Sequence, residues 1–154
     1  MTPRADVSMS RAEIVSFLAE PRNAVLSTLD RHGAPHAAAM WFLPGDEEVL
    51  MWTYGKSQKA RNLARDARCS LLVDDGLAYG ELRGVLIQGV ARLIDDYDQI
   101  LAIGRGLFTR YTSPETGNQI PEGPLAAIEQ QAHKRVGIAV PMARLASWDH
   151  RKLA

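Results

Sequence analysis

The sequence predicts a mainly β fold with peripheral helices, in which an antiparallel sheet closes into a small barrel. About seven short apolar segments, several of them rich in β-branched residues, have the length and composition of strands. Most connections between them are tight turns, which join antiparallel neighbours rather than the parallel strands of a βαβ fold. At 154 residues, the chain has the length of one domain that can bury its own core.

The first third of the chain carries one predicted helix and three predicted strands. Ser10 and Glu13 match a capping box, which predicts that a helix begins there, and Pro21 ends it. We expect residues 1–9 to form a flexible leader and residues 10–154 to form a single domain. The predicted strands that follow the helix are residues 23–29, 35–43 and 49–54.

The rest of the chain alternates helices with strands. Ser57 is placed to cap a helix over residues 57–67. Residues 82–94 form a long apolar segment, and Gly89 in its middle indicates a bulge, a bend or the close approach of something flat. The other predicted elements are strands at residues 69–73, 135–140 and 144–148 and helices at residues 97–111 and 125–133.

Composition argues against several classes of function. The chain has 18 basic and 18 acidic side chains, so it lacks the excess of positive charge that nucleic-acid binding usually needs. There is no run of 18 apolar residues, so we expect no membrane span. The N-terminal segment lacks the apolar core of an export signal, and the single cysteine, Cys69, allows no internal disulfide, so we expect a cytoplasmic protein. The four histidines have no ligand-like spacing with carboxylates or thiols, and we therefore expect no metal site.

A basic cluster follows the third predicted strand. Residues 52–68 read WTYGKSQKARNLARDAR, with five basic side chains and one acidic side chain. Cations at the start of a helix, in a chain that is neutral overall, indicate a site for one localised anion such as a phosphate. The alternative interpretation is a solvated basic helix whose Leu63 lies in the core. The candidate phosphate ligands are Thr53, Lys56, Lys59 and Asn62.

The second predicted strand places small residues beside aromatic ones. Residues 36–43 read HAAAMWFL, in which alternate side chains point to opposite faces of the strand. The small side chains at residues 37–39 would let a flat ring lie against the backbone, with Met40, Trp41 and Trp52 near it. The alternative interpretation is the ordinary core packing of a central strand.

Taken in order, the segments resemble the split-barrel family of pyridoxamine 5′-phosphate oxidase-like flavin and deazaflavin oxidoreductases. The resemblance runs over about residues 10–153 and rests on AVLSTLDRHGAPHAAAMWF, KSQKARNLARDAR, LRGVLIQGVARLIDD and KRVGIAVPMARLASWDHRKL. Its most specific parts are the pattern KxxKxxNLxxDxR and the closing SWDHRKL. They are similar to a branch many of whose members use the deazaflavin coenzyme F-420 rather than FMN.

The resemblance implies a homodimer of six-stranded antiparallel split β-barrels with two cofactor sites at the subunit interface. It places the cofactor phosphate at Lys59, Asn62 and the turn before them. It places Gln88 beside the ring or its ribityl chain, although this position is often Glu in the family. It also brings Trp148 to the site from the C-terminal segment, which could come from the other subunit. The ring would lie along Ala39, Met40, Trp41, Phe42, Trp52 and Thr53.

The function that the resemblance implies is hydride transfer between bound F-420 or FMN and a small organic substrate, with the cofactor supplying the chemistry. Tyr79 and Trp148 are candidates for shaping the substrate pocket, and His36 and Tyr54 are candidates for donating a proton. F-420 carries an anionic tail that FMN lacks. Three further cations that could serve this tail favour F-420, and they are Lys56, Arg61 and Arg65.

Two other functions stay open. The first is a non-catalytic flavin- or haem-binding carrier or sensor on the same barrel, because one fold hosts several functions. The second is a small nucleic-acid-binding β-barrel, which would need a basic face that extends beyond residues 56–68. The identity of the substrate does not follow from the sequence.

Overall fold

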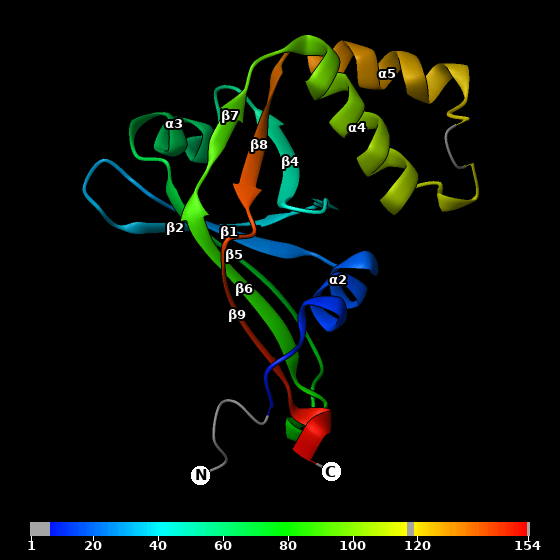
Figure 1. Ribbon diagram of the computed structural model, residues 1–154. Coiled ribbons are helices and arrows are strands. Elements are labelled where there is room, and N and C mark those ends of the chain that lie inside the picture. Colours follow the sequence, from blue (N-terminus) through cyan, green and yellow to red (C-terminus); the bar gives the residue numbers. More distant parts are fainter. Residues whose placement is uncertain (1–6, 117–118, 154) are drawn as a thin grey trace.

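The computed structural model describes residues 7–116 and 119–153, which form two antiparallel sheets with helices around them (Figure 1). One sheet has five strands in the order β2-β1-β5-β6-β9, and the other has four in the order β3-β4-β8-β7. The strands are β1 (Ala24–Leu29), β2 (Pro35–Met40), β3 (Leu43–Pro44), β4 (Glu48–Tyr54), β5 (Arg68–Asp75), β6 (Arg83–Val90), β7 (Arg92–Ile94), β8 (Arg135–Pro141) and β9 (Arg144–Asp149).

The helices lie on the outside of the two sheets, as the sequence predicts. Helices α4 and α5 lie together beside the four-stranded sheet, and α3 lies on the other side of the molecule (Figure 1). The α-helices are α2 (Arg11–Ala19), α3 (Gln58–Arg65), α4 (Tyr97–Tyr111) and α5 (Glu122–Ala132). Short 3-10 turns are η1 (Tyr79–Glu81), η2 (Pro114–Thr116) and η3 (His150–Leu153). None of the helices that the described residues form is long and apolar enough to span a membrane.

The predicted helix caps are confirmed. Ser10 and Glu13 form the expected capping box, in which the Ser10 side chain accepts a bond of 3.2 Å from the N–H of Glu13 and the Glu13 carboxylate accepts one from the N–H of Ser10. Ser57 caps α3 by accepting a bond of 3.2 Å from the N–H of Ala60. The part of the predicted leader at residues 1–6 lies outside the described residues, whereas Met9 is buried in the core.

The chain passes between the two sheets at four places, and two of them divide strands that the sequence predicts as continuous. The predicted strand 35–43 breaks at residues 41–42, between β2 and β3. The predicted strand 82–94 breaks at Ala91, between β6 and β7. Of the other two crossings, the segment that contains α3 joins β4 to β5, and residues 142–143 join β8 to β9.

Each of the three short crossings takes a backbone N–H out of its sheet and gives it another partner, since a buried N–H without an acceptor would cost free energy. The N–H of Ala91 donates to the carbonyl of Ala67, and the N–H of Met142 donates to the carbonyl of Glu47. Gly89, where a bulge or bend is one of the expectations, stays paired in the ladder opposite Cys69. The bend falls instead at Ala91, where the chain changes sheets.

The main core lies between the sheets and is built from alternate residues along the strands, whose side chains point inward. Leu26, Met51, Leu71, Ile87 and Ile138 are fully buried there. A smaller apolar cluster lies between the four-stranded sheet and α4. Alternation along the strands sends the intervening side chains to the opposite face of each sheet.

The outer face of the five-stranded sheet carries an apolar row that crosses all five strands. Paired residues place these side chains next to each other, from one edge strand to the other. They remain partly or largely exposed. The members of this outer row are Ala39, Val25, Leu72, Leu86 and Ala146.

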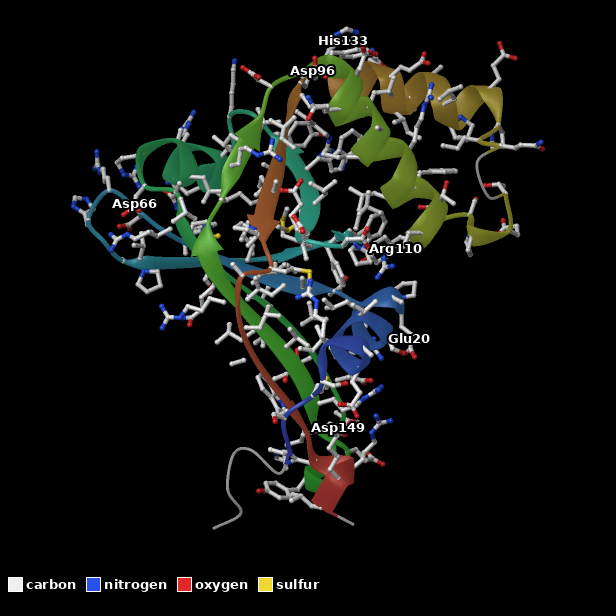
Figure 2. The ribbon with its side chains drawn as sticks, in the orientation of Figure 1. Glu20, Asp66, Asp96, Arg110, His133 and Asp149 are labelled. Atoms are coloured by element: carbon white, nitrogen blue, oxygen red, sulfur yellow. The ribbon has the colours of Figure 1, made fainter. Side chains whose placement is uncertain are left out.

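Hydrogen bonds from Arg110 connect α4 to the C-terminal end of α2. Arg110 and Glu20, both labelled in Figure 2, meet at the C-terminal end of α2. The Arg110 guanidinium donates to the carbonyls of Leu18, Ala19 and Glu20 at 2.8 to 3.0 Å. It therefore satisfies carbonyls that have no partner within the helix.

Candidate functional site

A hollow of about 510 Å³ opens between three parts of the fold: the crossing from β2 to β3, the start of α3, and the paired ends of β4 and β8. Its lining combines small, aromatic and basic side chains. The nine residues that line it are Asn23, Ala39, Met40, Trp41, Trp52, Thr53, Tyr54, Lys59 and Arg135. We call it the aromatic–cationic hollow.

Trp41 forms one aromatic wall of this hollow, and Tyr111 holds it from behind. Trp41 lies on the crossing between β2 and β3 and is 47% exposed. Its ring stacks on that of Tyr111, with 4.7 Å between the ring centroids and 0° between the planes. The hydroxyl of Tyr111 accepts a bond of 3.2 Å from the N–H of Phe42 and lies 2.8 Å from the carbonyl of Arg22. Tyr111 thus provides an acceptor for the N–H of Phe42 at the crossing and also supports the ring of Trp41.

Trp52 forms a second aromatic wall and packs against α4. A Cβ atom added at Gly104 would lie 2.5 Å from Cζ3 of Trp52, far inside the van der Waals limit. Only glycine allows the helix to approach the indole this closely. The Arg135 guanidinium carbon lies 4.4 Å from the centroid of the Trp52 ring, so the indole is held by a helix and a cation.

Two cations, Lys59 and Arg135, share the hollow. Burial, and second the positive charge of Arg135, lower the pKa of Lys59 below its usual value. Burial likewise lowers the pKa of Arg135, although that guanidinium stays charged at any ordinary pH. None of the nine lining residues is acidic. The hollow is therefore a partly desolvated region of positive charge that suits an anion.

The N-terminal turn of α3 is arranged by a chain of side-chain hydrogen bonds. Thr53 is a buried residue of the lining, and its hydroxyl lies 3.2 Å from that of Ser57, the residue that caps α3. Asn62 is fully buried and donates a bond of 2.9 Å to the hydroxyl of Thr28 in β1. Its carbonyl accepts from Gln58 at 2.7 Å, so the Asn62 amide ties α3 to the five-stranded sheet.

The structure brings together six of the eleven predicted cofactor-binding residues in the aromatic–cationic hollow: Ala39, Met40, Trp41, Trp52, Thr53 and Lys59. Lys56 is exposed in the turn between β4 and α3, outside the lining. Phe42 is fully buried in the core, and Asn62 is buried behind α3. The predicted role of these three residues in binding remains a prediction.

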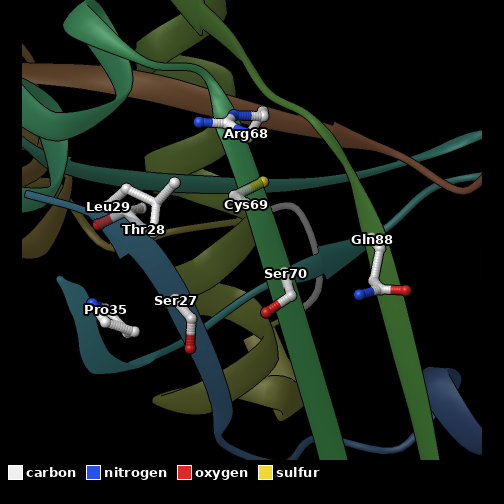
Figure 3. A pocket seen from close by; sticks show the side chains of 8 residues that line it. All are labelled: Ser27, Thr28, Leu29, Pro35, Arg68, Cys69, Ser70 and Gln88. Atoms are coloured by element: carbon white, nitrogen blue, oxygen red, sulfur yellow. The ribbon is translucent and has the colours of Figure 1, made fainter. Parts of the chain in front are cut away.

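Gln88 lies elsewhere, in a separate hollow of about 300 Å³ on the outer face of the five-stranded sheet (Figure 3). Figure 3 shows its side chain on β6, across the neighbouring strand from Ser27 and Pro35. Cys69 also lines this outer hollow, and burial raises the pKa of its thiol, which disfavours the reactive thiolate. The other lining residues are Thr28, Leu29, Arg68 and Ser70.

Trp148 lies in β9, near the narrow end of the molecule. It pairs with Gly84, and a Cβ atom added there would lie 2.2 Å from Cζ2 of the indole. Tyr79, the other residue predicted to shape a substrate pocket, is 72% exposed and contacts His150 at the same end. Neither Trp148 nor Tyr79 lines the aromatic–cationic hollow of its own chain.

Of the two candidate proton donors, Tyr54 lines the hollow and His36 does not. Asn23 and Arg135 also line the hollow, although the sequence did not indicate them. Arg135 is the first residue of β8, and only the pairing of Tyr54 with Arg135 across two strands brings it to the site. Among residues 7–116 and 119–153, no group of three or more His, Cys, Asp or Glu side chains is placed to hold a metal ion.

The residues that line the hollow fit a flavin-like group better than a metal ion or a neutral apolar molecule. Ala39 leaves room for a flat ring beside the backbone, and Trp41 and Trp52 offer aromatic walls. Lys59 and Arg135 supply the positive charge that a phosphate needs. A flat ring with a phosphate on a short chain would use both kinds of surface.

Comparison with known proteins gives a family match over nearly the whole chain. The family model described as pyridoxamine 5′-phosphate oxidase matches residues 10–149. No curated protein gave a significant match.

Several solved structures are similar to this fold. A conserved hypothetical protein, Rv2991 from Mycobacterium tuberculosis, is 40% identical, with a TM-score of 0.88 over 99% of this chain and 92% of that chain. An F-420 reductase is 25% identical, with a TM-score of 0.64 over 84% of this chain and 93% of that one. An FAD and haem binding protein from Mycobacterium smegmatis shares the fold, with a TM-score of 0.67 at 18% identity over 90% of this chain and 70% of that chain.

Proposed function

Because the chain belongs to the pyridoxamine 5′-phosphate oxidase family and has its split-barrel fold, we propose that it binds F-420 or FMN and acts as an oxidoreductase on a small organic substrate. The observation that carries this proposal is the aromatic–cationic hollow, which combines room for a flat ring with two cations and no acidic neighbour. The similarity to an F-420 reductase supports the deazaflavin over FMN.

The residues of the hollow have separate tasks in this proposal. Lys59 attracts the phosphate, and Thr53 holds the Ser57 cap in place beside it. Ala39 and Met40 present the floor on which the ring lies, and Trp41 limits its tilt. The bound coenzyme supplies the hydride chemistry, while the protein orients it and excludes water. Tyr54, which also lines the hollow, has a phenolic hydroxyl that can exchange a proton with substrate.

We further propose that the working unit is a homodimer. The outer row of Ala39, Val25, Leu72, Leu86 and Ala146 supports this, because an apolar row across a whole sheet face is favourable to cover. Ala39 belongs both to this row and to the hollow, so a second copy on the row would lie next to the ligand. In such a dimer Trp148 or Tyr79 of the partner would be available to close the site.

Titration of the apoprotein with FMN and with F-420, followed by tryptophan quenching, tests the proposal. Trp41 and Trp52 line the hollow of their own chain, so quenching that a Trp148→Phe variant keeps comes from them, and quenching that it loses comes from Trp148 of the partner subunit. Tight F-420 binding with weak FMN binding would support a deazaflavin-dependent reductase, and the reverse would support an FMN protein. Binding of neither would overturn the proposal.

A non-catalytic carrier or sensor of flavin or haem is the second candidate. It is favoured by the sparse acid–base chemistry of the hollow, where Tyr54 is the one hydroxyl-bearing aromatic residue among the nine that line it. Haemin belongs in the same titration series for this reason. A tightly bound cofactor that no nicotinamide or deazaflavin donor reduces, or that no acceptor reoxidises, would favour this second function over an oxidoreductase.

A further inference from the structure

We infer that Arg135 is a second anion-binding residue of the aromatic–cationic hollow, and that with Lys59 it holds an oxyanion of the ligand. The inference rests on the proposed function, because it concerns the same site. It adds a residue that the sequence did not indicate and a chemical requirement on the ligand, which must carry a phosphate or carboxylate within reach of both cations.

Two aromatic rings fix the position of the guanidinium. Its central carbon lies 4.4 Å from the centroid of Trp52 and 4.2 Å from that of Tyr54. Contacts of this kind hold the planar cation by its face and leave its N–H edge free to donate. Arg135 enters at the start of β8, directly opposite Tyr54 in β4, so the backbone ladder sets its place.

In the described part of the chain the N–H edge of Arg135 has two partners, the Tyr54 hydroxyl and the Gln131 side chain, but no carboxylate or backbone carbonyl. Its Nε is buried and has no hydrogen-bond acceptor. Nη2 reaches the side-chain carbonyl of Gln131 at 3.4 Å, which is a long and weak bond for a charged donor. A buried, charged N–H without an acceptor costs free energy, and an incoming oxyanion would relieve that cost.

Arg110, which holds α4 against α2, is a useful comparison, because its N–H groups have well-placed acceptors. Its Nε also lacks an acceptor, but its other nitrogens donate to three carbonyls at the end of α2. The bonds from Nη1 and Nη2 to these carbonyls hold α4 against the end of α2. Arg135 has no comparable set of acceptors and faces a hollow rather than a helix end.

The neighbouring Lys59 points to the same ligand chemistry. Among the described residues Lys59 has no hydrogen bond or ion pair, and Arg135 is the charged group that acts on it. Burial, and second the repulsion between two like charges in the hollow, lower the pKa of Lys59. An oxyanion between them would convert the repulsion into attraction for both.

A double comparison of variants and ligands tests the inference. Each ligand pair differs in its charged part: FMN against riboflavin, and F-420 against the deazaflavin riboside without phosphate and tail. Each is titrated against the wild type, Arg135→Met, Arg135→Lys and Arg92→Met. Met keeps an unbranched apolar chain against the two rings, and Lys restores the charge. Arg92 is an exposed arginine on the same sheet, outside the hollow, and controls for the loss of one positive charge.

Loss of one charge-assisted contact should weaken the binding of a charged ligand by about 10- to 100-fold. Weaker FMN binding by Arg135→Met, with riboflavin unchanged and partial recovery in Arg135→Lys, would assign the phosphate as the bound group. A loss confined to F-420, with FMN unchanged, would assign a carboxylate of its tail. Equal losses for charged and uncharged ligands, or a matching loss in Arg92→Met, would overturn the inference.

Pyrophosphate separates this inference from the proposed function. If the wild type binds no flavin or deazaflavin, the proposed function fails, and the thermal midpoint with and without pyrophosphate then decides about Arg135. A rise in the midpoint of the wild type that is lost in Arg135→Met but kept in Arg92→Met would support the anion site. An unchanged midpoint in the wild type would overturn it as well.

Discussion

The indole of Trp41 lies parallel to the ring of Tyr111, with 4.7 Å between their centroids, although the two residues come from a sheet crossing and from the last turn of α4. The same tyrosine hydroxyl accepts the N–H of Phe42, which the crossing withdraws from the sheets. One side chain of a distant helix therefore supports both the bend in the backbone and the exposed aromatic wall of the hollow.

Removal of the Tyr111 ring should affect ligand binding, while removal of its hydroxyl should affect mainly stability. Tyr111→Phe keeps the stack on Trp41 but leaves the N–H of Phe42 without its acceptor, which should lower the free energy of unfolding by about 1 to 3 kcal/mol. Tyr111→Leu also frees Trp41 and should weaken flavin or deazaflavin binding further. Urea unfolding and ligand titration of both variants measure the difference. Equal ligand affinity in Phe and Leu variants would contradict the positioning of Trp41 by the ring.

Gly104→Ala should destabilise the protein even though alanine is the better helix former. The added methyl group would lie 2.5 Å from Trp52, and such overpacking typically costs about 1 to 3 kcal/mol, which exceeds the gain in helix propensity of up to about 1 kcal/mol. Gly123 in α5 is the matched control, since a Cβ atom there meets nothing within 4 Å. Gly123→Ala should be neutral or stabilising by urea unfolding. A stable Gly104→Ala protein with an unchanged tryptophan spectrum would mean that the indole moves easily.

Ala39→Leu should block the ligand while the fold survives. Ala39 lies at an exposed position of β2 that lines the hollow, so a larger side chain fills the space of the ring without entering the core. Ala37→Leu, two residues earlier on the same face, changes the surface equally without lining the hollow. Ligand titration and thermal unfolding of both variants give the answer. Full occupancy by F-420 or FMN in Ala39→Leu would rule out a ring at this place.

Lys59→Met should weaken ligand binding and raise the free energy of unfolding of the apoprotein. Without its charge-assisted contact, phosphate-bearing ligands should bind more weakly by about 1.5 to 3 kcal/mol. The apoprotein should become more stable at neutral pH, because burial and Arg135 lower the pKa of Lys59 and the folded state carries its charge at a cost.

The sign of this effect fixes its dependence on pH. Between the lowered pKa and the ordinary 10.5, the unfolded state binds more protons than the folded state, so wild-type stability rises with pH relative to the variant. The advantage of Lys59→Met is therefore full below that window and disappears near its upper end. Urea unfolding across this range, with the exposed Lys134→Met as control, would reveal the trend. A constant difference would contradict it.

The outer row should carry self-association. Gel filtration at micromolar concentration should give about twice the chain mass of 17.0 kDa. Val25→Glu places a charge within the row, next to Ala39, at a residue that is 36% exposed, so it should yield a folded monomer with weaker cofactor binding. Val15→Glu, on the exposed side of α2, should stay dimeric. A wild-type monomer with cofactor bound would contradict a site at the interface.

The sequence predicted the helices well because their signals lie within a few neighbouring residues. The caps at Ser10 and Ser57 and the extent of α4 needed no knowledge of tertiary structure. The two predicted strands that break could not be divided from sequence, because the breaks depend on remote partners. The N–H of Phe42 is satisfied by a tyrosine 69 residues later in the chain.

The candidate site divides in the same way. Ala39, Trp41 and Lys59 were predicted because small, aromatic and basic residues stand out in a linear sequence. Arg135 has no local signal, since its place depends on the register of β8 against β4. Gln88 and Trp148 lie outside the hollow of one chain, a placement that only the pairing of β6 with β9 reveals.

The four crossings make the two sheets inseparable as folding units. The five-stranded sheet takes its strands from residues 24–40, 68–90 and 144–149, and the four-stranded sheet takes its strands from the intervals between them. No continuous piece of the chain contains one complete sheet without strands of the other, so neither sheet can form first as an independent subdomain. High contact order of this kind slows folding and makes unfolding cooperative. The amides in the centres of both sheets should therefore exchange with solvent through the same global opening, and the hollow keeps its shape as long as the domain is folded.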